Sequence, residues 1–406
     1  MEFHSLRKAA GHIFGLGPAW TVMIADIDVA SIVTGLESGS IYGYHGIFIL
    51  AILVFPLAVI QYAAGKLGLV TGKGLGELIR ENYGNRYSAI STIPMATTDF
   101  LSYLAEYAGI AIGMGIVGIS PLFSLPVVYV LHNMVVLTRR FSKVEKFLIP
   151  VSLTSVIGII TLALAFHPPA SGIIIGLSPM QPYGNRGFDY YMAAMIGAVI
   201  MPFMLFYQIG ATAGKKPSAG ELRHIRNETI IGAIVSEALM ICILLVGVRI
   251  GSDLGPVTIA GIAGLSHAYI SLLLAICMVS AGFLALVVIS LASTWGVGET
   301  FKWVTHGDAM PRGARKFYLL YVLESFPAMI IAILLGYSLM GLVIALMASL
   351  VIVLIPSGVF VGRLAGSRNV MGGHALSRRY MAGYWILLIA VEAAGLGGIT
   401  LGIFGS

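Results

Sequence analysis

Apolar residues run along this chain in long stretches that short polar segments separate. Eleven stretches are about 20 residues or longer, the length that an α-helix needs to cross the hydrocarbon core of a bilayer. The pattern predicts an all-α integral membrane protein with eleven transmembrane helices. The predicted spans are 13–36, 44–65, 94–116, 119–138, 147–167, 189–211, 228–250, 264–293, 317–336, 338–362 and 379–403.

Composition supports a membrane protein and disfavours other classes. Of the 406 residues, 58% are hydrophobic and 10% are charged, whereas soluble domains carry about 25% charged residues. The net charge is +6, but the sequence contains no run of five or six like charges. We therefore expect the lipid bilayer and not nucleic acid as a partner. Cys242 and Cys277 both lie in apolar runs, which disfavours a disulfide framework or a cysteine zinc site. The oligomeric state stays open.

The basic residues follow the alternation of the spans. With the N-terminus in the cytoplasm, all of the 24 lysine and arginine residues except Arg186 and Arg249 fall on the inner side. The positive-inside rule therefore predicts a multi-pass protein of the plasma or inner membrane with its N-terminus inside and its C-terminus outside. The basic patch before the first span is not read as a signal peptide, because the apolar run that follows it contains Asp26 and Asp28 and lacks a small-residue cleavage site.

Asp26 and Asp28 interrupt the first span near its middle. In a regular helix the two side chains would point about 200° apart. Both reach one cavity only if the helix unwinds, and the carbonyls that unwinding frees can join carboxylates around a cation. In the alternative, one acid faces an inner vestibule and the other a neighbouring helix. The single acids Glu237, Glu324 and Glu392 of later spans fit packing hydrogen bonds or protonated carboxyl groups.

The sixth span contains Pro202, which predicts a kink or break near Ala198. Spans one and six cross in opposite directions, and each is interrupted near its middle. This pattern is typical of an inverted-repeat transporter whose discontinuous helices meet at the midplane. In the third span, Asp99, Tyr103 and Glu106 share one helical face, which indicates either a packing seam or a proton or ion route.

Short motifs in the first 80 residues and in spans three, six and ten carry a family resemblance. They include Gly17-Pro18, Ile41-Tyr42-Gly43-Tyr44, Gln61-Tyr62-Ala63-Ala64, Leu104-Ala105-Glu106, Met201-Pro202 and Leu354-Ile355-Pro356. In these motifs and in its topology, the chain resembles a divergent, prokaryotic-like member of the Nramp (natural resistance-associated macrophage protein) family of divalent metal-ion transporters. The resemblance implies a LeuT-like fold in which helices 1–5 and 6–10 form inverted repeats and helices 1 and 6 are broken. One transporter domain, 1–406, would then hold repeats at about 13–167 and 189–362 and an extra helix at 379–403.

The resemblance also implies metal-binding residues in helix 1. The family motif Asp-Pro-Gly-Asn aligns with Asp28-Val29-Ala30-Ser31, so Asp28 is kept and Ser31 offers one hydroxyl oxygen in place of an amide. Ala25 matches a family alanine near the site. Asp26 stands where the family usually has an uncharged residue and would add a carboxylate.

In helix 6, the family's alanine carbonyl and methionine sulfur match Ala198 and Met201. Spacing alone favours a packing role for Met201. The helix break at Pro202 and the family match favour a metal ligand instead. The family's proton-related residues depart further: its helix 3 aspartate aligns with Tyr103, Glu106 is kept, and its helix 6 histidine is Phe203. Weak or absent proton coupling is therefore expected, with Asp99 and Glu106 as the remaining acids of helix 3.

The expected function is that of a secondary transporter that moves divalent metal ions by alternating access. Carboxylate and backbone oxygens suit hard divalent cations, and a thioether favours Mn²⁺ and Fe²⁺ over Mg²⁺ and Ca²⁺. The metal would be the substrate, and neither a permanent cofactor nor enzymatic activity is expected. The alternatives are a Mg²⁺ transporter of an Nramp-related branch, which typically lacks the helix 6 methionine, and an amino-acid symporter, whose carboxylate substrate two acids would repel.

Two further classes are disfavoured. An intramembrane aspartyl protease would need acids in Tyr-Asp and Gly-Leu-Gly-Asp contexts, and neither occurs in the sequence. A receptor or sensor built on a transporter-like domain would be expected to carry a signalling extension, and none follows the last predicted span.

Overall fold

The computed structural model describes residues 17–137, 141–215, 217–254, 268–303, 315–335 and 342–404, together with Leu339. Within these ranges the regular secondary structure is helical, as predicted, and no strand occurs. The predicted spans that begin at 13, 264 and 338 start outside the described residues.

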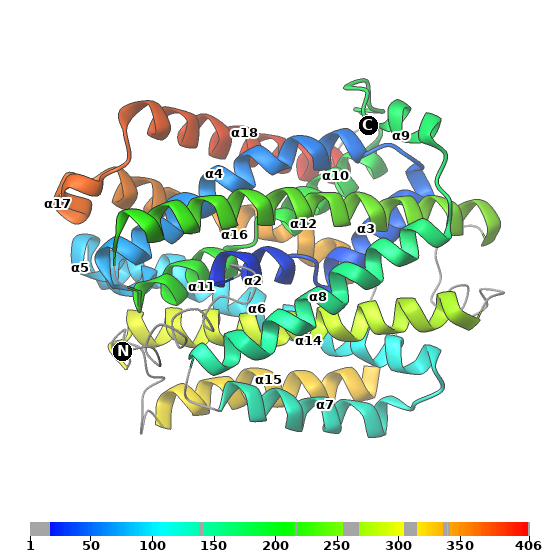
Figure 1. Ribbon diagram of the computed structural model, residues 1–406, viewed down its shortest axis with the longest axis horizontal. Coiled ribbons are helices and arrows are strands. Elements are labelled where there is room, and N and C mark those ends of the chain that lie inside the picture. Colours follow the sequence, from blue (N-terminus) through cyan, green and yellow to red (C-terminus); the bar gives the residue numbers. More distant parts are fainter. Residues whose placement is uncertain are drawn as a thin grey trace, which may run out of the picture.

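The helices follow the predicted spans closely, with short helices in some of the connections (Figure 1). They are α2 (Pro18–Ala25), α3 (Val29–Tyr42), α4 (Ile47–Thr71), α5 (Leu75–Tyr83), α6 (Asn85–Ile116), α7 (Pro121–Val136), α8 (Phe141–Ala165), α9 (Ala170–Gly176), α10 (Arg186–Val199), α11 (Pro202–Ala213), α12 (Ala219–Leu254), α14 (Ala268–Thr300), α15 (Arg315–Leu335), α16 (Val343–Gly366), α17 (Arg368–Met371) and α18 (Arg378–Phe404), with a 3₁₀ turn, η3 (Gly372–His374), before α18.

Most of the long helices run along roughly one common direction (Figure 1). Helices α7 and α15 pack against each other along one edge, and α18 lies along the opposite edge, where it packs on α10 and α16. The most apolar part of the segment Arg186–Ala213, which contains α10 and α11, is 100% buried, compared with 22% for α18. The sixth predicted span is therefore central, and the exposed apolar faces of the outer helices are left for lipid.

Eight helical segments of the described chain are long and apolar enough to cross a membrane, and the bent pair α2–α3 makes nine. Helix α7 is apolar but shorter, and α6, which carries a stripe of polar side chains, is not among the nine. Both helices coincide with predicted spans, 94–116 and 119–138. The structure thus supports a multi-span helical protein, and the count of eleven stays a prediction.

Candidate metal site at two helix breaks

The first predicted span is broken between α2 and α3, which are bent by 46° relative to each other. Asp28 is the N-cap of α3, and its Oδ1 accepts a hydrogen bond from the Ser31 N–H at 2.6 Å. Aspartate is among the most favourable N-cap residues. Helix α3 can therefore start here without the Pro-Gly pair of the related motif.

A second carboxyl group, that of Glu106 on α6, lies at the same helix start. Its Oε2 accepts a hydrogen bond from the Val29 N–H at 3.1 Å. Gly109, almost one turn further along α6, lacks a side chain, so Val29 packs directly against the α6 backbone. The N-terminus of α3, the positive end of its dipole, thus faces both Asp28 and Glu106.

These two carboxyl groups are fully buried and lie close enough to interact. Oδ2 of Asp28 and Oε1 of Glu106 make no hydrogen bond of normal length and angle to another described residue, although the two carboxyl groups and the Ser31 hydroxyl lie close together. Buried charges are normally paired or coordinate a metal ion. The pair therefore leaves acceptor oxygens available for a cation.

Asp26 contacts a different neighbour. Its Oδ2 accepts a hydrogen bond from Ser236 Oγ of α12 at 2.8 Å, and the next residue of α12, Glu237, lies close enough to Asp26 for their charges to interact. The two aspartates of the first break are therefore directed to different helices, Asp28 to α6 and Asp26 to α12.

The second break separates α10 from α11, as the proline predicted. Ile200 and Met201 leave the helical conformation, with φ/ψ of −126°/81° and −84°/142°. Pro202 occupies the first position of α11, where its missing N–H is not needed. Ala198 lies one residue before the end of α10, where carbonyl groups have no partner within the helix.

The surroundings of the second break are apolar and tight. Met201 is fully buried, and Phe203, where the family has a titratable side chain, is 1% exposed. Gly197 lies directly against the carbonyl of Met347 on α16, so a larger residue there would collide with backbone.

The helices that flank the two breaks pack against each other: α3 packs on α10, and α2 packs on α11. No group of three His, Cys, Asp or Glu residues in the described ranges is placed to hold a metal. A metal ion at the breaks would therefore need hydroxyl, carbonyl or sulfur donors as well. The sequence predicts four such donors: the Ser31 hydroxyl, which lies close to the Asp28 carboxyl, the carbonyls of Ala25 and Ala198, and the sulfur of Met201, whose side chain is buried.

The polar stripe of α6 divides between two environments. Glu106 faces α3, whereas the Tyr103 hydroxyl donates a hydrogen bond to Ser290 Oγ of α14 at 2.7 Å. Asp99 lies near Glu324 of α15, whose Oε1 accepts a hydrogen bond from Ser293 Oγ at 3.0 Å. Asp99 and Tyr103 thus belong to the contacts of α6 with α14 and α15.

Sequence analysis missed His132, a fully buried residue of α7. Its Nε2 is 2.8 Å from Ser290 Oγ, and its Nδ1 is 3.0 Å from the Tyr107 hydroxyl. A lone histidine in an otherwise apolar predicted span was the available signal.

Glu228 of α12 was missed as well. Its Oε1 accepts hydrogen bonds from the N–H groups of Gly17, at 2.5 Å, and Trp20, at 2.8 Å. This contact ties the start of α2 to α12. The signal in the sequence was an acid at the start of the predicted span 228–250.

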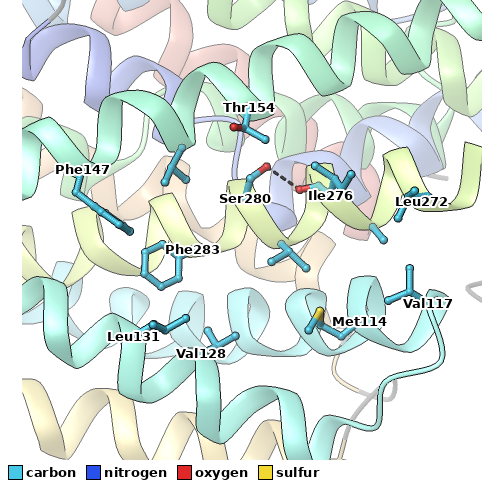
Figure 2. A pocket seen from close by; sticks show the side chains of 13 residues that line it. Met114, Val117, Val128, Leu131, Phe147, Thr154, Leu272, Ile276, Ser280 and Phe283 are labelled. Carbon is cyan, nitrogen blue, oxygen red and sulfur yellow. Dashed lines mark hydrogen bonds between the residues drawn. The ribbon is translucent and has the colours of Figure 1, made fainter. Parts of the chain in front are cut away.

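A pocket of about 440 Å³ lies between α6, α7, α8 and α14, and no predicted site residue lines it (Figure 2). Its walls are mostly apolar, as Phe147 and Phe283 show. The hydroxyls of Thr154 and Ser280 already donate to the backbone carbonyls of Pro150 and Ile276. The pocket therefore offers no set of ligands for a cation.

Sequence comparisons agree with the resemblance. The family model for natural resistance-associated macrophage protein-like proteins, Nramp, matches residues 19–400. The divalent metal cation transporter MntH of Verminephrobacter eiseniae is 29% identical over 214 residues, which cover 50% of this chain and 47% of that protein. MntH of Vibrio campbellii is 26% identical over 250 residues, or 59% of this chain and 58% of the relative. The chain spans about half the length of the curated relatives it matches.

Solved structures show the same fold at low identity. A crystal structure of a mutant of the Eremococcus coleocola manganese transporter has a TM-score of 0.78 at 18% identity and covers 96% of this chain and 86% of that one. MhsT in complex with L-phenylalanine has a TM-score of 0.57 at 11% identity, with coverages of 95% and 98%. The fold is therefore the predicted LeuT-like transporter fold. Because the family model matches nearly the whole sequence, the chain belongs to the Nramp family.

Proposed function

We propose that this protein is a secondary transporter that moves divalent metal ions across the cell membrane by alternating access. The ion would bind between the two breaks, as a substrate and not as a resident cofactor. The observation that carries the proposal is the environment of Asp28. It is fully buried at the positive end of α3, one oxygen caps the helix, and the other makes no hydrogen bond of normal geometry beside the Glu106 carboxyl and the Ser31 hydroxyl. The names of the MntH relatives support the same activity.

Charge favours a dication. Asp28 and Glu106 bring two carboxyl groups into a fully buried space, and a doubly charged ion neutralises two carboxylates without leaving excess charge. The proposed donors are the Asp28 carboxylate, the Ser31 hydroxyl, the carbonyls of Ala25 and Ala198, and the Met201 sulfur. Asp26 hydrogen-bonds to α12, and we do not include it among the ligands of this ion.

The Met201 sulfur would select among dications. A thioether adds an interaction that Mn²⁺ and Fe²⁺ gain and that the harder Mg²⁺ and Ca²⁺ do not. We therefore favour the Mn²⁺ and Fe²⁺ class, and Mg²⁺ transport is the alternative that the experiment below distinguishes. A carboxylate-bearing amino acid is a poor substrate here, because the first break already holds the acids Asp26, Asp28 and Glu106.

Alternating access would use the breaks as hinges. Helix α2 is a separate short segment whose start is held by Glu228, so its release from α12 would open one side of the site. The two breaks fit repeats at about 13–167 and 189–362, with the N-terminus in the cytoplasm and the C-terminus outside. Coupling to protons would be weak or absent, since Phe203 cannot titrate and the Tyr103 hydroxyl is engaged with Ser290.

The test is uptake by proteoliposomes that enclose a pH dye. We expect saturable Mn²⁺ uptake that exceeds Mg²⁺ uptake, with little acidification of the lumen. Saturable uptake of Mg²⁺ alone would support the Mg²⁺ alternative. Absence of saturable uptake for every dication, with uptake of a labelled amino acid instead, would overturn the proposal.

A further inference from the structure

A second acidic pair lies on the α12 side of the first break. Asp26 and Glu237 are both fully buried, and the Ser236 hydroxyl fixes Asp26 Oδ2 at 2.8 Å. Glu237 follows Ser236 in α12, and its buried carboxyl lies within electrostatic range of Asp26. Neither residue belongs to the metal donors proposed above.

The carboxyl oxygens of this pair are incompletely satisfied. Asp26 Oδ1 and both oxygens of Glu237 have no hydrogen-bond partner among the described residues. An ionised pair would place two unpaired charges in a buried environment, and a protonated Glu237 would still need an acceptor for its proton. A group from outside the described chain is therefore needed to satisfy these atoms.

We propose that Asp26, Glu237 and Ser236 form a second cation site, which binds a monovalent hard cation of the Na⁺ type. All of its donors are oxygens, the kind that hard cations prefer. They comprise three free carboxylate oxygens and one hydroxyl, fewer than the six to eight oxygens that Ca²⁺ takes. Mg²⁺ usually keeps several waters, and side chains that are 0% exposed leave little access for them. With one carboxyl group of the pair protonated, a singly charged ion leaves no excess buried charge, and it is easier to dehydrate than a dication.

The bound ion would tie α12 to the end of α2. Its occupancy would then favour one arrangement of the first break, and Na⁺ and the transported dication would alter each other's affinity reciprocally. Binding of Na⁺ itself does not depend on the proposed transport, whereas this linkage rests on it.

The test measures binding of radiolabelled Na⁺ to the purified full chain in lipid nanodiscs, with choline replacing Na⁺ at constant ionic strength and pH. We expect saturable binding of one ion per chain. Glu237→Gln, which keeps the side-chain shape, should weaken binding at least tenfold, and Ser236→Ala should weaken it less. Glu392→Gln, which alters another partly buried acid on α18, should bind Na⁺ like the wild type.

The possible outcomes test the second cation site and the proposed transport independently of each other. Absence of saturable Na⁺ binding in the wild type, or equal binding by Glu237→Gln, would overturn the second site. So would two Mn²⁺ ions per wild-type chain that fall to one in Glu237→Gln, because the pair would then bind a dication. A wild-type chain that binds Na⁺ but no Mn²⁺ would instead contradict the proposed transport and leave the second site standing.

Discussion

The two helix breaks have opposite chemistry. The first holds Asp26 and Asp28, and Glu106 reaches it from α6. The second holds Ile200, Met201 and Pro202, with no charged side chain in the break itself. Their causes differ too: an aspartate N-cap starts α3, whereas a proline starts α11.

If a metal ion binds at the breaks as proposed, this difference predicts separate tasks for them in metal binding. Carboxylates attract any cation strongly and discriminate little between dications of similar size, whereas a thioether discriminates by softness and contributes little attraction. We therefore expect changes at the first break to affect whether a dication binds, and changes at the second break to affect which dication binds.

The largest effect is expected at Asp28. Asp28→Asn keeps a good N-cap but removes the charge, and Asp28→Ala removes both. Loss of a buried charge partner costs about 2–5 kcal/mol, which is about 30-fold or more in affinity, so both variants should lose saturable Mn²⁺ uptake. The measurement is Mn²⁺ uptake by proteoliposomes, with Glu392→Ala as control and gel filtration to show that the variants stay monodisperse. Uptake like that of the wild type would remove Asp28 from the site.

The next largest effect is expected from a change in packing at the two breaks. A methyl group at Gly197 would meet the backbone carbonyl of Met347, whereas one at Gly109 would meet the side chain of Val29. Overpacking costs about 1–3 kcal/mol, and backbone yields less than a side chain. Gly197→Ala should therefore lower the melting temperature and the transport rate more than Gly109→Ala. Gly397→Ala, which has nothing within 4 Å, is the neutral control, and equal melting temperatures for all three would contradict the packing of the second break.

A smaller effect concerns selectivity. Met201→Ala removes the sulfur, so the preference for Mn²⁺ over Mg²⁺ and Ca²⁺ should relax by about tenfold while total uptake falls less. Competition of Mg²⁺ and Ca²⁺ with Mn²⁺ uptake measures this ratio. Met204→Ala creates a comparable cavity in the same buried helix and should leave the ratio unchanged. If both variants compete alike, the Met201 sulfur only packs.

The sequence was sufficient to predict where the helices break. Two acids in the middle of an apolar span and a proline in another are local signals, and both predicted breaks are present. Hydropathy likewise placed the long apolar helices, because burial in lipid requires little beyond length and apolarity.

The partners of the broken segments were beyond sequence analysis. Asp26 contacts Ser236, 210 residues away, and Val29 contacts Glu106, 77 residues away. A spacing of two residues between Asp26 and Asp28 says that a regular helix would separate them, but it does not say which helix each will meet. The same holds for His132, whose partners Tyr107 and Ser290 come from α6 and α14.

The smallest expected effect is that of a proton gradient. Phe203 offers no group that accepts a proton. A tyrosine hydroxyl, with a reference pKa of about 10, is a poor proton carrier at neutral pH. The Tyr103 hydroxyl already donates a hydrogen bond to Ser290. Asp99 is one helical turn from Tyr103 and belongs to the contacts with α15, so it could replace the missing acid only if the path moved by about 6 Å. We expect Mn²⁺ influx to follow its own gradient, with less than about a twofold increase when an inward proton gradient is imposed, as a lumenal pH dye and Mn²⁺ uptake measured together will show. Acidification in proportion to uptake, abolished by Glu106→Gln, would contradict this and would make Glu106 and Asp99 the relay. Asp99→Asn should then lose coupling as well. Proton movement would in that case be a further task of the first break alone, because the second break has no side chain that titrates.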